Sequence, residues 1–511
     1  NNDKPYDQFI KEQIAGDLLP HKNYQEYNNH LTATGFLTVG TKNLGANPRQ
    51  YMADTADDQI DAITRGFLGM TLSCARCHDH KFDPFSQEDY YGVAGLFSNT
   101  ENLDGVYRGN NNTGYLGDYG FLVNEHTEDL YKKRKVKEWM LLSQIWNLEK
   151  QIESIKTWNK RATEEQLQRE LNKRNKVLAE AKKNLPEEYL QYLEYLEPVM
   201  SVRDKQKMQE IKLAIRGEVN NLGDEVPRRL PEIFSDRPDL AFENTSGRLQ
   251  LANWIAHKTN PLTYRVYVNR IWRHLIGKGI IDSFDNFGIL GGEPNNIKLL
   301  NYLSDKFTVN RLSTKRLIKT IVMSDVYKRS SNYDDHNFDI DPDNIFFWRA
   351  NERRLEAEQI RDTLLFVFGK LTGSQTNASD LQTDIKRVSK DLNKHIQTHT
   401  GRSIYLTSLR DRKEELLDIF DRPDNSLMAA ERSTTTVSTQ ALYLMNNPTV
   451  INMCKEEAEK TKDVREIYKK FLSREPLDSE LSKINKFIND GGTIPQLIQT
   501  IICTGEFRNL R

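Results

Sequence analysis

The sequence lacks the features that mark several large classes of protein. Its 511 residues include only four cysteines, too few for the disulfide scaffold of a small secreted domain. No uninterrupted apolar run approaches the ~20 residues that a membrane-spanning helix needs. The 72 lysines and arginines nearly balance 73 aspartates and glutamates, so net charge does not attract the chain to nucleic acid or to an anionic membrane. We therefore expect a water-soluble protein that neither spans a membrane nor binds nucleic acid.

Hydrophobic residues make up 37% of the sequence, enough for real cores. At roughly 150 residues per domain, the length predicts two or three domains. The chain begins at Asn1 with neither a methionine nor a signal peptide, so we expect it to be processed, trimmed or partial.

Composition divides the chain into three regions. Residues 1–125 mix short helical patterns with loops rich in glycine and asparagine. Residues 126–224 are highly charged and carry apolar residues every three or four positions, which predicts a protruding helical hairpin. We expect that deleting residues 127–215 would leave cofactor binding intact. Residues 225–511 repeat the 3.6-residue helical period, and residues 402–409 are the best strand candidate. We predict a mainly α fold with a helical N-terminal domain, a charged helical hairpin and a larger helical C-terminal domain with few strands.

One short motif carries the clearest chemistry. The stretch TLSCARCHDHKFDPFSQEDYYGVAGLF, residues 71–97, contains a C-x-x-C-H sequence at Cys74, Cys77 and His78. In such a motif the two thiols can add across the vinyl groups of a haem, and the histidine becomes an axial iron ligand. Residues i, i+3 and i+4 share one face of a helical turn, which suits this task. We predict covalent haem c at the two cysteines, with the iron held by His78.

Other interpretations of the motif remain open. A thioredoxin-like pair would need a βαβ context, whereas the surroundings are helical. A zinc site could recruit Cys74, Cys77, His78 and His80, although zinc ligands usually come as two well-separated pairs. A pair of buried cysteines would leave the histidine unexplained.

The residues after the motif could also bind or tune a metal. His80 lies too close in sequence to His78 to approach the iron from its opposite face, so a distal ligand must come from elsewhere or the iron face is open. His80 and Asp83 could relay protons, tune the iron or contribute to a Ca²⁺ site. Alternatively, they belong to a turn fixed by Asp83 and the following proline.

Long stretches of the sequence resemble a known family. CARCHDHKFDPFSQEDYYGVAGLF, preceded by DKPYDQFIKEQIAGDLLP and ATGFLTVGTK, resembles the planctomycete cytochrome c-type domain of unknown function. That domain occurs in secreted proteins of planctomycetes, verrucomicrobia and marine Bacteroidetes. GRLQLANWIAHKTNPLTYRVYVNRIWRHLIGKGIIDSFDNFGILGGEP and FDRPDNSLMAAERSTTTVSTQALYLMNNP resemble its usual C-terminal companion domain, also of unknown function. The resemblance covers most of residues 1–110 and 225–455.

The resemblance implies three segments: a cytochrome c-like haem domain over residues 1–125, a hairpin connector over 126–224 and a helical companion domain over 225–511. The family's first domain normally starts before DKPYDQF, so we expect it to be incomplete here. The resemblance also implies export to the periplasm or cell surface and a link to polysaccharide metabolism, because family genes often neighbour sulfatases and glycan-degrading enzymes.

These implications favour an extracytoplasmic haem oxidoreductase whose partner is a redox protein or a glycan-type substrate. One alternative is a non-catalytic electron carrier or surface assembly module with a buried, bis-ligated haem. Another is a hydrolase or lyase with a structural haem, and a zinc or other metal site at the cysteines is a weaker one. The sequence leaves the oligomeric state open.

A second cluster of polar residues lies in the companion region. The segment RVYVNRIWRHLIG places Asn269, Arg270 and His274 on one helix, with the arginine and the histidine four residues apart. Planar donors of this kind suit carboxylate, sulfate or haem propionate groups. We take these three residues as catalytic candidates. The structural alternative is a helix whose polar side chains are paired with groups elsewhere in the protein.

Overall fold

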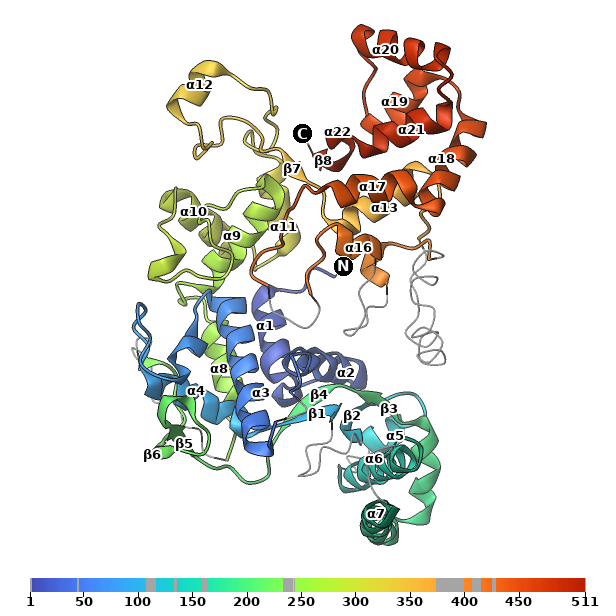
Figure 1. The fold of residues 1–511 in the computed structure, drawn as a ribbon. Coiled ribbons are helices and arrows are strands. Elements are labelled where there is room, and N and C mark those ends of the chain that lie inside the picture. Colours follow the sequence, from blue (N-terminus) through green and yellow to red (C-terminus); the bar gives the residue numbers. More distant parts are fainter. Residues whose placement is uncertain are drawn as a thin grey trace. The chain divides into compact units, whose positions relative to one another are not determined.

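The computed structural model describes residues 2–510 except 44–45, 107–115, 133–135, 159–163, 233–241, 243, 374–398, 407–414 and 425–428. The structure is 57% helical and 7% strand, which confirms the predicted mainly α class. Two units can be separated (Figure 1): Asn1–His274 with Gly279–Val322, and Leu275–Lys278 with Met323–Arg511. None of the described helices has both the length and the apolar character needed to cross a bilayer.

The first unit begins with four helices: α1 (Tyr6–Ala15), α2 (Tyr24–Ala33), α3 (Pro48–Ile63) and α4 (Gln87–Ser98). Short 3₁₀ segments follow the first two, η1 (Gly16–Leu18) and η2 (Thr34–Thr38). The Asn47 side chain caps α3 by accepting the backbone N–H of Gln50. The helix then runs into a π-helical turn, η3 (Thr64–Leu68), which ends at Gly69 in the left-handed conformation. The predicted helical period is confirmed, because Ile60 and Ile63 are both fully buried.

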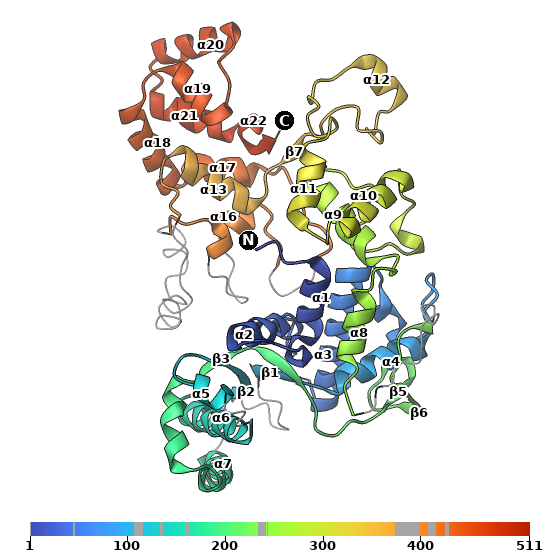
Figure 2. The same ribbon diagram turned by 180° about the vertical axis from the view of Figure 1, so that it is seen from behind.

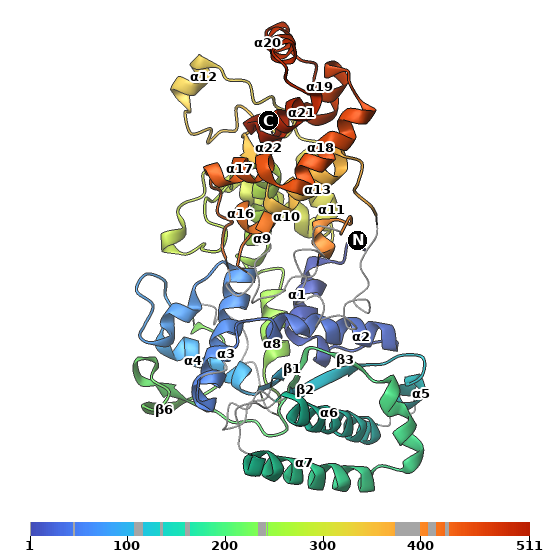
Figure 3. The ribbon, with the colours of Figure 1, turned by 45° about the vertical axis from the view of Figure 1, so that its right-hand side comes forward.

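A four-stranded antiparallel sheet in the order β3-β2-β1-β4 follows these helices. Its strands are β1 (Thr100–Val106), β2 (Leu116–Leu122), β3 (Glu197–Val199) and β4 (Ser201–Asp204). Between β2 and β3 the chain forms α5 (Glu128–Lys132), α6 (Val136–Trp158), α7 (Glu164–Asn184) and η5 (Glu187–Tyr195). Helices α6 and α7 pair beside the sheet (Figure 3), and Leu142 and Ile145 of α6 pack with Phe121 of β2.

The helical hairpin is therefore confirmed, but the charged region also contributes strands. Besides β3 and β4 it supplies β5 (Ile211–Ala214), a turn η6 (Ile215–Gly217) and most of β6 (Leu222–Val226). Beyond it, α8 (Arg248–Ile255), α9 (Thr263–Ile276), η8 (Ile289–Gly291), α10 (Ile297–Val309) and α11 (Thr314–Val322) follow. Nearly all of these residues also belong to the first unit. The division at residues 125 and 224 stays a prediction about sequence modules.

A completely buried arginine connects three distant parts of the first unit. The guanidinium of Arg248 donates to both carboxylate oxygens of Asp17, each at 2.8 Å, and to Asp204 Oδ1 at 2.6 Å. It also donates to the Ile14 carbonyl at 3.0 Å. These bonds fix the end of α1, the end of β4 and the start of α8 relative to one another. Burial of the positive charge is compensated by two carboxylates.

The second unit contains β7 (Arg353–Arg354), which pairs with β8 (Asn509–Leu510), and nine helices in its described residues (Figure 2). They are α12 (Asp335–Ile340), α13 (Ala357–Val367), α16 (Glu415–Ile419), α17 (Ser438–Asn446), α18 (Pro448–Lys460), α19 (Val464–Leu472), α20 (Asp478–Asn489), α21 (Ile494–Cys503) and α22 (Gly505–Arg508).

The second unit holds the other two cysteines and the segment predicted to be a strand. Cys454 lies in its hydrophobic core with Cys503 packed against that core, and burial raises the pKa of Cys454 to about 12, as expected for an inert thiol. The strand predicted over residues 402–409 is wrong in its described part. There the chain forms a 3₁₀ turn, η9 (Ser403–Tyr405), whereas residues 407–409 lie outside the described residues.

Replacing Arg248 with methionine should destabilise the first unit by about 3–5 kcal/mol, because it leaves two largely buried carboxylates without their cation. Denaturant titration followed by circular dichroism would measure this loss. The control is Arg203→Met, which removes an exposed ion pair with Glu101 and should cost less than about 1 kcal/mol. Equal costs for the two substitutions would contradict the role given to Arg248.

The first unit should tolerate loss of the hairpin tip but not of the whole region 127–215. Deleting that region removes Asp204 and strand β5, so we expect that the first unit would no longer fold. Replacing only residues 154–170 with a Gly-Ser linker keeps the buried Leu142 and Ile145 and should leave the fold intact. Limited proteolysis and circular dichroism would compare the two proteins. If the protein that lacks residues 127–215 folds, the region is a dispensable connector, as the sequence predicts.

Candidate haem attachment site

The C-x-x-C-H motif begins on η4 (Leu72–Arg76), a short 3₁₀ helix after Gly69, with Cys77 at the C-cap of this helix and His78 just beyond it. Leu72 and Ala75 are fully buried, whereas Cys74 and Cys77 are exposed and unpaired by disulfides. In a 3₁₀ helix, side chains three residues apart lie on the same side. Leu72 and Ala75 therefore face the core together, and Cys74 and Cys77 face outward together. Both thiols are therefore presented on the same side of the turn.

His78 follows on the same exposed surface. Its Nδ1 lies 2.6 Å from the carbonyl oxygen of Asp79. A carbonyl oxygen can only accept, so Nδ1 carries the proton and Nε2 keeps its lone pair. A backbone bond of this kind fixes the tautomer of a metal-binding histidine. The imidazole is thus prepared to bind iron through Nε2.

The backbone between the thiols is anchored from two helices. Arg76 donates to Asp54 Oδ1 at 3.0 Å and lies 3.4 Å from Asp57 Oδ2, both on α3. The Arg76 carbonyl accepts from Gln87 Nε2 at 2.9 Å and from the Tyr91 hydroxyl at 3.3 Å, both on α4. Burial raises the pKa of Tyr91, so its hydroxyl remains a donor at neutral pH. The turn that presents the thiols is held in place by these bonds.

A glycine lies close against one thiol. Gly217, in the turn between β5 and β6, has φ 74°, and a Cβ placed on it would lie 2.6 Å from Cys77 Sγ. A side chain at this position would therefore press on the sulfur. Together, the outward thiols and the oriented imidazole fit a covalently attached haem.

His80 and Asp83 take part in the turn that follows. His80 Nδ1 accepts the backbone N–H groups of Asp83 at 2.8 Å and Phe82 at 3.2 Å, and its Nε2 lies 3.0 Å from Thr71 Oγ1. Asp83 Oδ2 lies 3.6 Å from the same Nε2. Both side chains are almost fully buried. These contacts agree with the interpretation of this segment as a turn.

The zinc and calcium alternatives require several ligands close together. Within the described residues, no three side chains of histidine, cysteine, aspartate or glutamate are grouped so that they could hold a metal ion. His80 uses its lone pair at Nδ1 on backbone donors, so it is not oriented as a fourth zinc ligand beside Cys74, Cys77 and His78.

Asn269 and Arg270 bind backbone groups. Asn269 is fully buried, donates to the Ile281 carbonyl at 3.0 Å and accepts the backbone N–H groups of Ile280 (2.8 Å) and Ile281 (2.9 Å). Arg270 donates to the carbonyl oxygens of Phe284 at 2.9 Å, of Arg65 at 2.7 Å and of Gly66. Burial lowers the pKa of Arg270, but a guanidinium remains charged in proteins.

Together these bonds hold a loop of the companion domain, residues 280–291, against the segment around the cysteine motif. The Arg65 guanidinium donates to Asp285 Oδ2, with its Nε at 2.7 Å. Further along, the Phe287 N–H donates to the Gly69 carbonyl at 2.6 Å. At the far end, the Ile289 N–H donates to Asp83 Oδ1 at 2.9 Å. The loop thus runs beside the motif from η3 to the turn at Asp83.

The three catalytic candidates do not point to one place. Asn269 and Arg270 are directed to backbone groups, whereas His274 is exposed, with its ring 5.9 Å from that of Phe284. Their catalytic role stays a prediction, and the contacts of the first two are those of loop-holding residues. Sequence reasoning missed Gly217 and Asp285. The row of aspartates on α3 could have suggested a partner for Arg76, since i, i+3 spacing places Asp54 and Asp57 on one face.

Substitution separates the structural and catalytic roles on α9. Asn269→Leu leaves several buried backbone groups unpaired, each costing about 1–3 kcal/mol, so it should strongly lower the free energy of unfolding. His274→Ala, five residues along the same helix, should change it by about 0.5 kcal/mol or less. Chemical denaturation monitored by tryptophan fluorescence would give both values. A stable Asn269→Leu protein would favour a site role for this residue instead.

Comparison with known proteins agrees with the resemblance. The family model PSCyt2, protein of unknown function (DUF1549), matches residues 1–102, and the model PSD1, protein of unknown function (DUF1553), matches residues 247–488. No curated protein and no solved structure matches the chain. The chain therefore carries a PSCyt2 domain, the planctomycete cytochrome c-like domain, followed by its companion PSD1 domain.

Proposed function

We propose that the protein is an extracytoplasmic c-type haem protein, with haem attached at Cys74 and Cys77 and the iron held by His78. The observation that carries this proposal is the arrangement on η4. Two exposed thiols and an exposed imidazole with its Nε2 lone pair available lie on one turn whose backbone is tied to α3 and α4. A buried structural cysteine pair would not need such exposure.

Attachment of a haem would need no external oxidant. Each thiol would add across one vinyl group, with the sulfur bonding to one carbon, the thiol proton moving to the other and the carbon–carbon double bond becoming single. When bound, the haem would supply one-electron redox chemistry. The chain's own residues hold the attachment turn, through Arg76, and fix the tautomer of His78, which would hold the iron, through the Asp79 carbonyl.

The finer parts of the proposal come from the family. The resemblance favours a location in the periplasm or at the cell surface. It also favours the role of an oxidoreductase in polysaccharide metabolism, which would act with a redox partner or on a glycan-type substrate. Haem c suits such a location, since a covalent bond retains the cofactor outside the cell. A structural role for Asn269 and Arg270 leaves this proposal unchanged, because the haem would carry the redox step.

Haem staining of denatured protein tests the attachment. After periplasmic co-expression with a haem-attachment system, the unchanged protein should give a stained band in denaturing electrophoresis, because thioether bonds survive denaturation. Cys74→Ala/Cys77→Ala should fold, as judged by circular dichroism, but should give a colourless band. Cys503→Ala, which removes a half-buried thiol, should stain like the unchanged protein. A colourless band from the unchanged protein would overturn the proposal.

The same preparation distinguishes a catalyst from a carrier. If one iron face is open, cyanide should shift the Soret absorption band, as expected for an oxidoreductase that acts on a bound molecule. A bis-ligated haem would not respond and would favour the electron carrier. His78→Ala should retain the covalent haem but change its visible spectrum, because it loses the axial ligand.

A further inference from the structure

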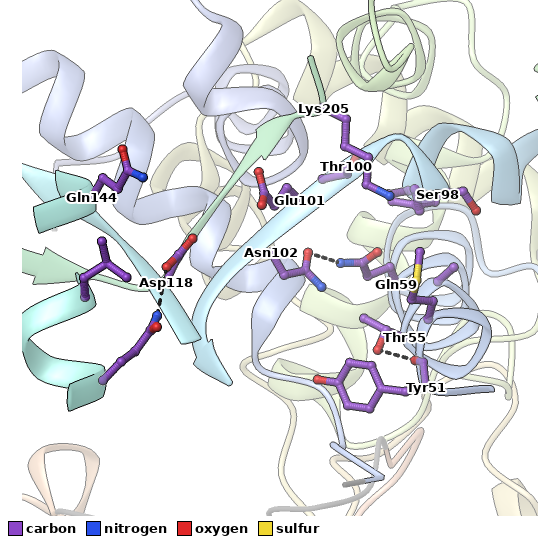
Figure 4. A pocket seen from close by; sticks show the side chains of 15 residues that line it. Tyr51, Thr55, Gln59, Ser98, Thr100, Glu101, Asn102, Asp118, Gln144 and Lys205 are labelled. Carbon is purple, nitrogen blue, oxygen red and sulfur yellow. Dashed lines mark hydrogen bonds between the residues drawn. The ribbon is translucent and has the colours of Figure 1, made fainter. Parts of the chain in front are cut away.

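A cavity of about 500 Å³ in the first unit is lined by described residues from outside the cysteine motif (Figure 4). Helix α3 lines one side of it and helix α6 the other, with strands β1 and β2 between them. Figure 4 shows Gln59, Thr55 and Tyr51 on the α3 side and Gln144 and Asp118 on the opposite side. The volume falls within the range of small-molecule binding sites, about 300–1,000 Å³.

Polar groups on both sides are held in fixed orientations. On the α3 side, the nearly buried Gln59 donates through Nε2 to Asn102 Oδ1 at 3.0 Å and to the Leu37 carbonyl at 2.9 Å. Opposite, buried Arg174 donates to Gln151 Oε1, and Gln151 donates to Asp118 Oδ1, each at 3.3 Å. Such supporting bonds orient the carboxamides in advance, which lowers the entropy cost of binding.

The charges of the cavity exclude strongly ionic ligands. Its ionisable lining residues are Glu101, Asp118 and Lys205, and the Glu101 carboxylate accepts from Arg203 Nε at 2.7 Å. Neither sign dominates, so a polyanion or a polycation would find no matching field. By contrast, carboxamides and hydroxyls, such as those of Gln144 and Thr55, provide both donors and acceptors.

Apolar groups lie among the polar ones. Met52 of α3, about half exposed, and Leu148 of α6 both line the cavity. A saccharide matches this mixture, because its hydroxyl groups both donate and accept hydrogen bonds while its ring C–H groups are apolar. We propose that this cavity binds a neutral polyhydroxylated molecule, such as a short saccharide.

Binding in the cavity does not depend on haem, whereas a link to redox chemistry would rest on the proposed function. Helix α3 relates the two sites: Asp54 and Asp57 hold Arg76 of the motif, while Tyr51 and Thr55 line the cavity. A ligand in the cavity would thus contact the same helix that anchors the haem attachment turn.

Saturation-transfer NMR on the full chain tests the proposal. The probes are neutral oligosaccharides built from glucose, mannose, galactose, xylose or fucose, with sulfate and spermidine as charged comparisons. At least one neutral probe should bind. Gln144→Trp, which fills the exposed edge of the cavity, should weaken that binding about tenfold or more, and Asn102→Leu should do the same by removing an oriented carboxamide. Gln168→Trp, on the exposed surface of α7, is the matched control and should bind normally.

Three results would overturn the proposal: no binding of any neutral probe, binding that survives both cavity substitutions, or a preference for sulfate or spermidine. Circular dichroism confirms that each variant is folded. The Cys74→Ala/Cys77→Ala protein should bind the saccharide as well as the unchanged protein. Haem staining of Gln144→Trp should also be normal, so failure at one site is distinguishable from failure at the other.

Discussion

The first unit depends on the buried charge of Arg248. Asp17, Asp204 and Arg248 lie far apart in the sequence: Asp17 is in η1 directly after α1, Asp204 ends β4 and Arg248 begins α8. An uncompensated charge in this position would be costly, so the three elements must meet for the unit to be stable. Since Asp17 belongs to the PSCyt2 domain and Arg248 to the PSD1 domain, the two sequence modules are joined within one unit.

The loop over residues 280–291 also connects the PSD1 domain to the segment around the cysteine motif. Arg270 reaches the carbonyl groups of Arg65 and Gly66, and Asp83 receives the Ile289 N–H. The companion domain therefore supplies part of the immediate structural support of the motif. This provides a physical reason for the two domains to occur together, independent of any reaction that either carries out.

Sequence reasoning succeeded where a pattern is local. Periodicity predicted the helices, because Ile60 and Leu142 report a buried face within a few residues of chain. Periodicity also placed Asn269 and Arg270 on one helix. It could not show that they bind backbone groups, because backbone partners leave no pattern of residue types in the sequence, so the two residues were interpreted as part of a site. Arg248 was not singled out for a related reason. Its partner Asp17 lies 231 residues away, and its partner Asp204 ends β4, a strand whose pairing cannot be deduced from the sequence alone. The polar cavity likewise forms only when α3 and α6 flank the sheet.

The separation of Asp17 from Arg248 by 231 residues has a consequence for synthesis. A chain emerging from its N-terminus exposes Cys74 and Cys77 long before Arg248 is made. Until then, Asp17 and Asp204 have no common cation, and the contacts that close the unit are non-local and slow to form. The thiols therefore pass through a period in which the chain around them is not yet packed against α8 and the rest of the PSD1 domain.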